Sequence, residues 1–100
     1  MKKLSLGWEE DALDDRAAIY EFLVDWNLEA AERTDRLIEE AAESLTSNPC
    51  RCPPCANGDG RKMILTKIPF LIIYSVDEKS GSVRVMRVFH QSQRIPGTDH

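Results

Sequence analysis

Two apolar runs in the C-terminal half constrain the fold of this chain most strongly. The first covers residues 70–74 and the second covers residues 83–90, and a turn that contains Gly81 lies between them. Runs rich in β-branched and aromatic residues suit the pleated, half-buried surface of a sheet. We therefore predict that these residues form two adjacent antiparallel strands.

The N-terminal half has the periodicity of helices. Alternation over residues 4–8 indicates a short first strand. Apolar residues at helical spacing then occupy residues 12–26, and a second apolar stripe occupies residues 30–45. Asn27 separates the two segments, and we expect its side chain to cap the second helix. So short a connection favours two antiparallel helices.

The remaining residues complete the predicted order. Residues 49–60 hold three prolines and two glycines and are expected to form a loop, and residues 61–68 are expected to form another strand. The order is then strand, two helices and three strands. This pattern predicts an α+β fold, in which an antiparallel sheet is covered on one face by an N-terminal helical hairpin. We expect a single domain over residues 1–100.

The two halves of the chain differ in charge. Residues 1–47 carry 13 acidic and 5 basic side chains, a net charge of −8, and residues 48–100 carry 4 acidic and 8 basic ones, a net charge of +4. The asymmetry indicates either an acidic partner for the basic half or simply acid-rich solvated helix faces. The overall charge of −4 argues against a nucleic-acid binder that relies on many phosphate contacts.

Two kinds of targeting segment are missing from the sequence. No apolar run approaches the roughly 20 residues of a membrane span. The first residues lack the apolar stretch of a signal peptide. We therefore expect a cytoplasmic protein that has no membrane partner.

Three cysteines form a C-x-C-x-x-C cluster in the predicted loop, at Cys50, Cys52 and Cys55. The last two have a spacing that occurs in zinc and iron–sulfur sites. A fourth ligand would have to be His90 or His100, and a second ligand pair is absent from the sequence. We expect free thiols with no metal and no cofactor; a bound metal and redox chemistry are the alternatives.

Six short motifs follow one another along the chain. They are WEEDALDD at residues 8–15, AA at 30–31, LTSNP at 45–49, GRK at 60–62, PFLIIY at 69–74 and VMRVFHQS at 85–92. In this order they resemble the RelE/ParE toxin superfamily of bacterial toxin–antitoxin modules, and its ParE branch most. The chain departs from the family pattern at residues 50–55, where a Gly-Arg pair is common, and near residue 93, where Gln93 and Arg94 compete for the position of a second arginine.

The resemblance implies a toxin with one of two activities. RelE-like members are ribosome-dependent ribonucleases. Under that alternative, Arg61 and Arg87 would stabilise charge on the scissile phosphate and His90 would act as acid or base. ParE-like members instead poison DNA gyrase, which requires a binding surface, and Arg84 and Arg94 would then contact the target.

Residue types favour gyrase poisoning over RNA cleavage. A nuclease that acts on the ribosome gains from many cationic contacts, whereas this chain is acidic overall, and His90 is the only histidine inside the motifs. Tyr74 is expected to be a core aromatic rather than a base-stacking platform. Trp8 and Trp26 are expected to pack in the core and in the hairpin.

The partners follow from the resemblance. They are a cognate antitoxin, in a toxin–antitoxin hetero-oligomer, and DNA gyrase, with the ribosome and mRNA as the alternative targets. The helical hairpin and the sheet edge are the candidate antitoxin surfaces. A non-toxic regulatory relative remains a third possibility.

Overall fold

The computed structural model describes residues 3–50, 52–54 and 60–92. It contains four strands and two helices in the predicted order. These are β1 (Ser5–Trp8), α1 (Glu10–Val24), α2 (Leu28–Ser44), β2 (Arg61–Ile64), β3 (Phe70–Asp77) and β4 (Ser82–His90).

The four strands form one sheet in the order β1-β4-β3-β2. The β3–β4 pair is antiparallel, as predicted, and so is the β2–β3 pair. Strand β1 runs parallel to β4, from Ser5 beside Ser82 to Trp8 beside Val85. The α+β class is confirmed, with the difference that the sheet is mixed rather than wholly antiparallel. The helical hairpin carries the chain from β1 to the other strands, so β1 can align with β4 in either direction without a tight turn.

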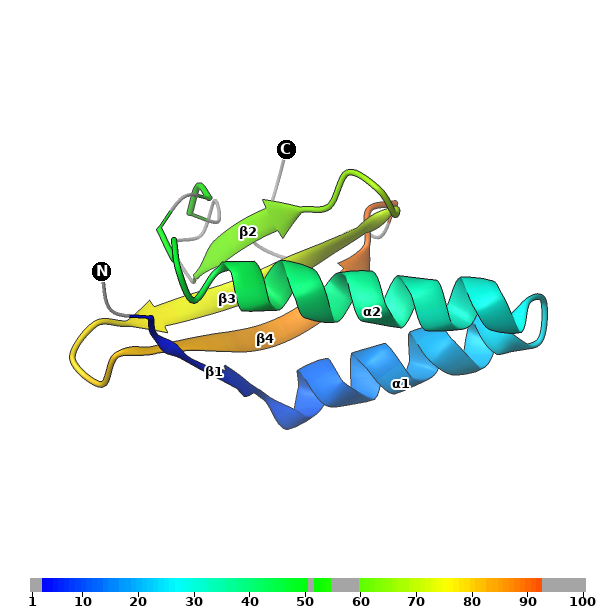
Figure 1. Ribbon diagram of the computed structural model, residues 1–100, viewed down its shortest axis with the longest axis horizontal. Coiled ribbons are helices and arrows are strands. Elements are labelled where there is room, and N and C mark those ends of the chain that lie inside the picture. Colours follow the sequence, from blue (N-terminus) through cyan, green and yellow to red (C-terminus); the bar gives the residue numbers. More distant parts are fainter. Residues whose placement is uncertain (1–2, 51, 55–59, 93–100) are drawn as a thin grey trace.

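The helical hairpin covers one face of the sheet (Figure 1). Helix α2 turns a stripe of buried residues inward, and its members are Ala31, Thr34, Ile38 and Ala42. Ile38 and Ala42 belong to a core cluster that includes Ile72 and Tyr74 of β3 and Val85 of β4. The spacing of three and four residues places the whole stripe on one helix face. On the opposite face of the sheet, Leu71 and Ile73 pack with Met86 and Phe89.

Local chemistry explains where two of the elements begin and end. The Asn27 side-chain oxygen accepts a hydrogen bond from the Ala30 backbone N–H at 3.1 Å, which confirms the predicted cap of α2. Strand β2 ends at Ile64, so the predicted range 61–68 was too long. The Leu65 N–H donates to the Phe70 carbonyl at 3.0 Å, and the chain reverses between these two residues.

The far end of the helical hairpin extends beyond the sheet (Figure 1). Its apolar side chains are exposed there: Trp26 by 79%, Phe22 by 67% and Leu28 by 53%. The expectation that Trp26 packs in the hairpin is therefore wrong, because the sheet ends before it could cover this residue. Trp8 does pack against the core, and the Arg16 guanidinium lies 4.5 Å from its ring centroid. In the described part of the chain, no helix is long and apolar enough to cross a membrane.

Candidate functional site

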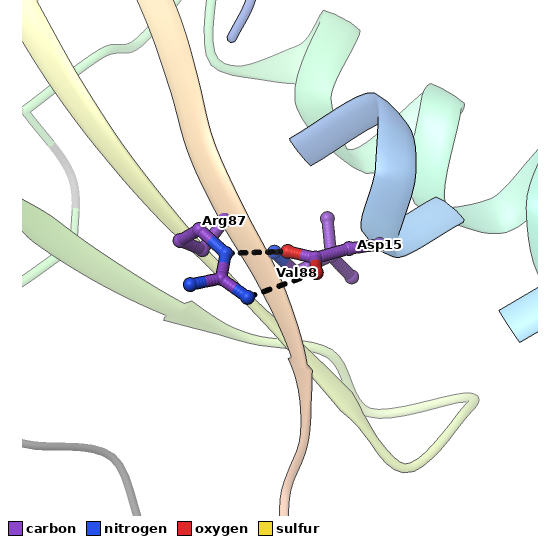
Figure 2. A network of polar contacts seen from close by, with 3 residues as sticks. All are labelled: Asp15, Arg87 and Val88. Carbon is purple, nitrogen blue, oxygen red and sulfur yellow. Dashed lines mark hydrogen bonds and ion pairs between the residues drawn. The ribbon is translucent and has the colours of Figure 1, made fainter. Parts of the chain in front are cut away.

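The most elaborate polar arrangement joins α1 to β4. The Arg87 guanidinium donates two hydrogen bonds to Asp15, from Nε to Oδ2 at 2.8 Å and from Nη2 to Oδ1 at 3.0 Å (Figure 2). Its central carbon also lies 4.6 Å from the centroid of the Phe89 ring. The hydrogen bond with Asp15 raises the pKa of Arg87 above its usual value. Arg87 is thus held on both sides, by a carboxylate and by an aromatic face.

Asp15 also accepts a hydrogen bond from the backbone of β4. Its Oδ2 atom accepts a hydrogen bond from the Val88 backbone N–H at 2.9 Å (Figure 2). Strand β1 stops at Trp8, opposite Val85, so it does not reach the level of Val88. The carboxylate of α1 takes the place of a neighbouring strand at this point. Its side chain is only 16% exposed, which makes both interactions stronger than those of a solvated ion pair.

A bulge in β4 shapes the surface around Arg87. The register with β3 shifts between Ile73 and Tyr74, because Ile73 pairs with Arg87 whereas Tyr74 pairs with Val85. Met86 is the extra residue. It packs with Ile73 on the face away from the helices. An extra residue of this kind bends a strand and redirects its side chains.

Arg84 lies further along β4 and is more accessible. Its Nη1 atom donates to Glu9 Oε2 at 2.8 Å, and both side chains are largely exposed. Such a surface ion pair holds the arginine only weakly. A shallow depression of about 460 Å³ lies beside it, lined by Glu9, Asp11, Ser75, Arg84, Met86 and Arg87.

Arg61 and Tyr74 hold the cysteine-containing loop against the sheet. The Arg61 Nη1 atom donates to the Cys52 carbonyl at 2.7 Å, and the Tyr74 hydroxyl donates to the Pro49 carbonyl at 2.7 Å. Tyr74 is completely buried, as expected for a core aromatic. Burial, together with the neighbouring Cys52 side chain, raises the pKa of Tyr74. Gly60 (φ +87°) fits closely here, because a Cβ atom would lie 2.7 Å from the Tyr74 carbonyl oxygen.

Cys50 and Cys52 are free thiols, the first exposed and the second half-buried against the core. Cys55 lies outside the described residues. Within residues 3–50, 52–54 and 60–92, no group of three or more His, Cys, Asp or Glu side chains is arranged to hold a metal ion.

His90 lies at the end of β4 and faces Phe70, whose ring it meets edge-on at a centroid distance of 5.2 Å. Its Nδ1 atom accepts a hydrogen bond from the Ser92 backbone N–H at 3.1 Å and lies 2.7 Å from the Ser92 hydroxyl. The adjacent Gln91 side chain donates to the carbonyls of Leu65 at 2.9 Å and of Phe70 at 3.2 Å. These bonds fasten the end of β4 to the β2–β3 turn.

The register separates the three residues expected for RNA cleavage. Arg87 pairs with Ile73, whereas Arg61 pairs with the next residue, Tyr74, so the two arginines belong to opposite faces of the sheet. His90 pairs with Phe70, four residues along β3 from the Tyr74 that pairs with Arg61. The described structure therefore does not bring these three side chains to one point. Arg94 lies outside the described residues.

Two residues with structural roles near Arg87 and His90 were not singled out from the sequence: Asp15 and Gln91. Asp15 falls within the first motif, three residues after the buried Ala12, so it lies on the same helix face. That spacing is the signal that could have identified it. Gln91 offers no comparable signal, because its partners are backbone carbonyls of a turn.

Comparisons with known proteins bear on the fold and on the family. The chain is similar to the chromosomal ParDE toxin–antitoxin system from P. aeruginosa, with a TM-score of 0.75 and 22% identity over 88% of this chain and 96% of that one. It is also similar to the RelBE2 toxin–antitoxin complex from Mycobacterium tuberculosis, with a TM-score of 0.71 and 16% identity over 89% and 99% of the two chains. At these identities the two structures establish the fold alone.

A search of curated proteins finds no match. The family model for the ParE toxin of the type II toxin–antitoxin system parDE matches residues 6–95. The match includes every described strand and helix except the first residue of β1. The chain therefore belongs to the ParE family of toxins of type II toxin–antitoxin systems.

Proposed function

We propose that this chain arrests bacterial growth by poisoning DNA gyrase in the cytoplasm, and that a cognate antitoxin neutralises it. The contacts of the Arg87 guanidinium are the observation that favours gyrase poisoning over RNA cleavage. Two hydrogen bonds to Asp15 and the contact with Phe89 occupy its guanidinium. A nuclease needs a cation that is ready to meet the charge of a reacting phosphate, and this one already has a carboxylate partner.

The separation of Arg61, Arg87 and His90 supports the same choice. Catalysis of phosphodiester cleavage requires its acid, base and cations within hydrogen-bond reach of one group. A gyrase poison requires only a complementary surface. On the accessible part of β4, Arg84 offers such a surface, and Arg94 remains a proposed contact to the target.

Paired assays test this function. Purified protein should inhibit gyrase supercoiling, or trap cleaved DNA, and it should leave ribosome-bound mRNA intact. Arg84→Glu should weaken the inhibition, because it reverses the charge that meets the target. Arg36→Glu makes the same charge change on α2, at a side chain of similar exposure, and is the matched control.

The opposite outcome has a clear signature. Codon-positioned cuts in ribosome-bound mRNA that disappear with His90→Ala or Arg61→Ala would establish the ribonuclease activity instead. Normal gyrase activity in the presence of soluble, folded protein would overturn the proposal.

A further inference from the structure

The cysteine-containing loop is bound to the start of β2 through its own backbone carbonyls. A single Arg61 atom, Nη1, donates to the Cys52 carbonyl at 2.7 Å and to the Cys50 carbonyl at 3.5 Å. The Lys62 N–H donates to the Pro53 carbonyl at 3.0 Å. The attachment of the loop therefore depends on where the backbone at the two cysteines directs these carbonyls.

The two thiols lie close together in a compact stretch of backbone. A disulfide requires Cα atoms about 4.4–6.8 Å apart, and a fully extended chain separates alternate residues by roughly 7 Å. The chain turns at residues 49–50 and bends at Cys52, so it is not extended here. The carbonyls of Cys50 and Cys52 also reach the same Arg61 atom. This backbone is of the kind that a disulfide between alternate residues needs.

The two thiols differ in their access to solvent. Cys50 is exposed, and a depression of about 290 Å³ lies beside it, lined also by Arg61 and by residues of β3. Cys52 is half-buried against the core, beside the Tyr74 hydroxyl. Susceptibility to oxidation increases with exposure. An oxidant in solution therefore meets Cys50 first, and Cys52 is the neighbouring thiol that can respond.

We infer that Cys50 and Cys52 are a site of reversible oxidation, at which a hydroperoxide joins the two sulfurs and thereby releases the loop from β2. This inference concerns neither gyrase nor the antitoxin and goes beyond the proposed function. It assigns a role to thiols that the proposed function does not use.

The reaction has two steps. The Cys50 sulfur attacks the peroxide, the O–O bond breaks, and a sulfenic acid and one molecule of water form. The Cys52 sulfur then attacks the oxidised sulfur, so the S–S bond forms, the S–O bond breaks, and the hydroxyl group leaves as water with the Cys52 proton. Together the two thiols give up two electrons and two protons, and the peroxide takes up both.

The new bond changes the attachment of the loop. A ring closed across one intervening residue is small, so its formation rotates the backbone at both cysteines. The half-buried Cys52 side chain must also turn toward the exposed Cys50. These movements turn the two carbonyls away from Arg61 and carry the adjacent Pro53 carbonyl away from Lys62.

A bond of this kind suits a reversible response. Disulfides are rare in a reducing cytoplasm, and those that form there are mostly transient or redox-sensing. A strained or exposed disulfide is also reduced more easily than a structural one. In the proposed cytoplasmic location, the two thiols are therefore free at rest and join only while an oxidant is present.

Peptide mapping tests the bond directly. The chain has three cysteines, and Cys55→Ser leaves only the proposed pair. Trypsin cleaves after Arg51, between Cys50 and Cys52, so the two thiols fall in separate peptides unless a disulfide joins them. After treatment with hydrogen peroxide, alkylation and non-reducing digestion, the two peptides should stay joined, and dithiothreitol should separate them. Without peroxide, both peptides should appear singly and alkylated.

Amide hydrogen exchange tests the release of the loop. In the oxidised Cys55→Ser protein, exchange at Lys62 should be at least about tenfold faster, because its acceptor has moved away. Exchange at Leu65, which donates to Phe70 at the other end of β2, should change by less than about twofold. The matched control is Cys50→Ser in the same background, which keeps Cys52 but cannot form the bond. Peroxide should leave exchange at Lys62 unchanged in this control.

Every result bears on the inference. Separate peptides after peroxide treatment, with the thiols free or singly oxidised, would overturn it. A joined pair with unchanged exchange at Lys62, or with equally faster exchange at Lys62 and Leu65, would overturn the release of the loop. Cys55→Ala repeats both measurements if Cys55→Ser does not fold.

Discussion

At the scale of single residues, Asp15 does most to organise the site. Its carboxylate joins α1 to β4 by binding a side chain and a backbone N–H at once. Removing it would leave the Val88 N–H without an acceptor and the Arg87 guanidinium without its ion partner. Such a substitution lowers the free energy of unfolding by more than the net contribution of the lost hydrogen bonds, because a partly buried polar group is left without a partner.

We expect Asp15→Ala to lower the free energy of unfolding by about 2 kcal/mol, after allowance for the partial exposure of Arg87. Asp15→Asn keeps an acceptor for Val88 but loses the charge, so its cost should be smaller. Urea denaturation of the two variants measures both effects. Arg36→Ala is the control: its pair with Glu40 spans 3.9 Å on an exposed helix face, and its loss should cost less than about 0.5 kcal/mol.

Tyr74 predicts how stability depends on alkaline pH. Its pKa is raised in the folded protein, so the folded state keeps the phenolic proton where the unfolded state loses it. The stabilisation is complete below the ordinary pKa of 10.0 and declines as the pH rises above it. The free energy of unfolding should therefore fall above about pH 10, and Tyr74→Phe should remove this part of the decline.

The second tyrosine, Tyr20, supplies the comparison for that experiment. Tyr20→Phe also removes a phenol hydroxyl but leaves the Tyr74 phenol in place, so it controls for the substitution itself. An identical decline in the wild type and in Tyr74→Phe would show that other groups cause it. Tyr74→Phe should also cost about 1 kcal/mol at neutral pH, because the Pro49 carbonyl loses its donor.

At the scale of elements, the helical hairpin is longer than the sheet it covers. The sheet buries the near part of the hairpin and leaves Phe22, Trp26 and Leu28 exposed at its far end. Exposed apolar residues of this kind, two of them aromatic, commonly mark a surface for a protein partner. The hairpin end is thus a candidate surface for the antitoxin.

Trp26→Glu should weaken toxin–antitoxin binding by about tenfold or more without lowering the free energy of unfolding. The side chain is 79% exposed, so the fold loses little when it changes. Titration calorimetry of the variant and of the conservative Trp26→Phe measures the effect. Equal affinities of all three proteins would exclude the hairpin end from the interface.

At the scale of the whole molecule, nearly all of the secondary structure followed from local pattern. Helical periodicity and the Asn27 cap defined the hairpin, and β-branched runs defined β3 and β4. The parallel pairing of β1 with β4 could not be predicted, because no residue in a four-residue strand identifies a distant partner. Trp26 was misjudged for a related reason: the pattern shows which helix face is apolar but not where the sheet beneath it ends.

The site was less predictable than the fold. Sequence motifs identified Arg87 and His90 as notable, but the carboxylate that binds Arg87 lies 72 positions away in the chain. A role that depends on such a partner emerges only when the chain is folded.

The whole chain, expressed without its antitoxin, should arrest bacterial growth, and co-expression of the antitoxin should restore it. Co-expression should restore growth because a bound antitoxin covers the surface with which the toxin contacts its target, or holds the toxin in a state that cannot contact it. Colony counts after induction measure the effect, with Asp15→Ala as a destabilised comparison. Normal growth at confirmed soluble expression would count against a toxin.

The pairing of β1 with β4 also determines when the protein can complete its fold. Ser5 must meet Ser82, so β1 cannot pair until β4 has been synthesised. During synthesis the N-terminal strand leaves the ribosome long before its partner does, and contacts between such distant positions form slowly. Any product that terminates before β4 lacks the strand that joins β1 to β3. The sheet therefore cannot close until β4 has been synthesised, and translation that stops before β4 leaves β1 without its partner strand.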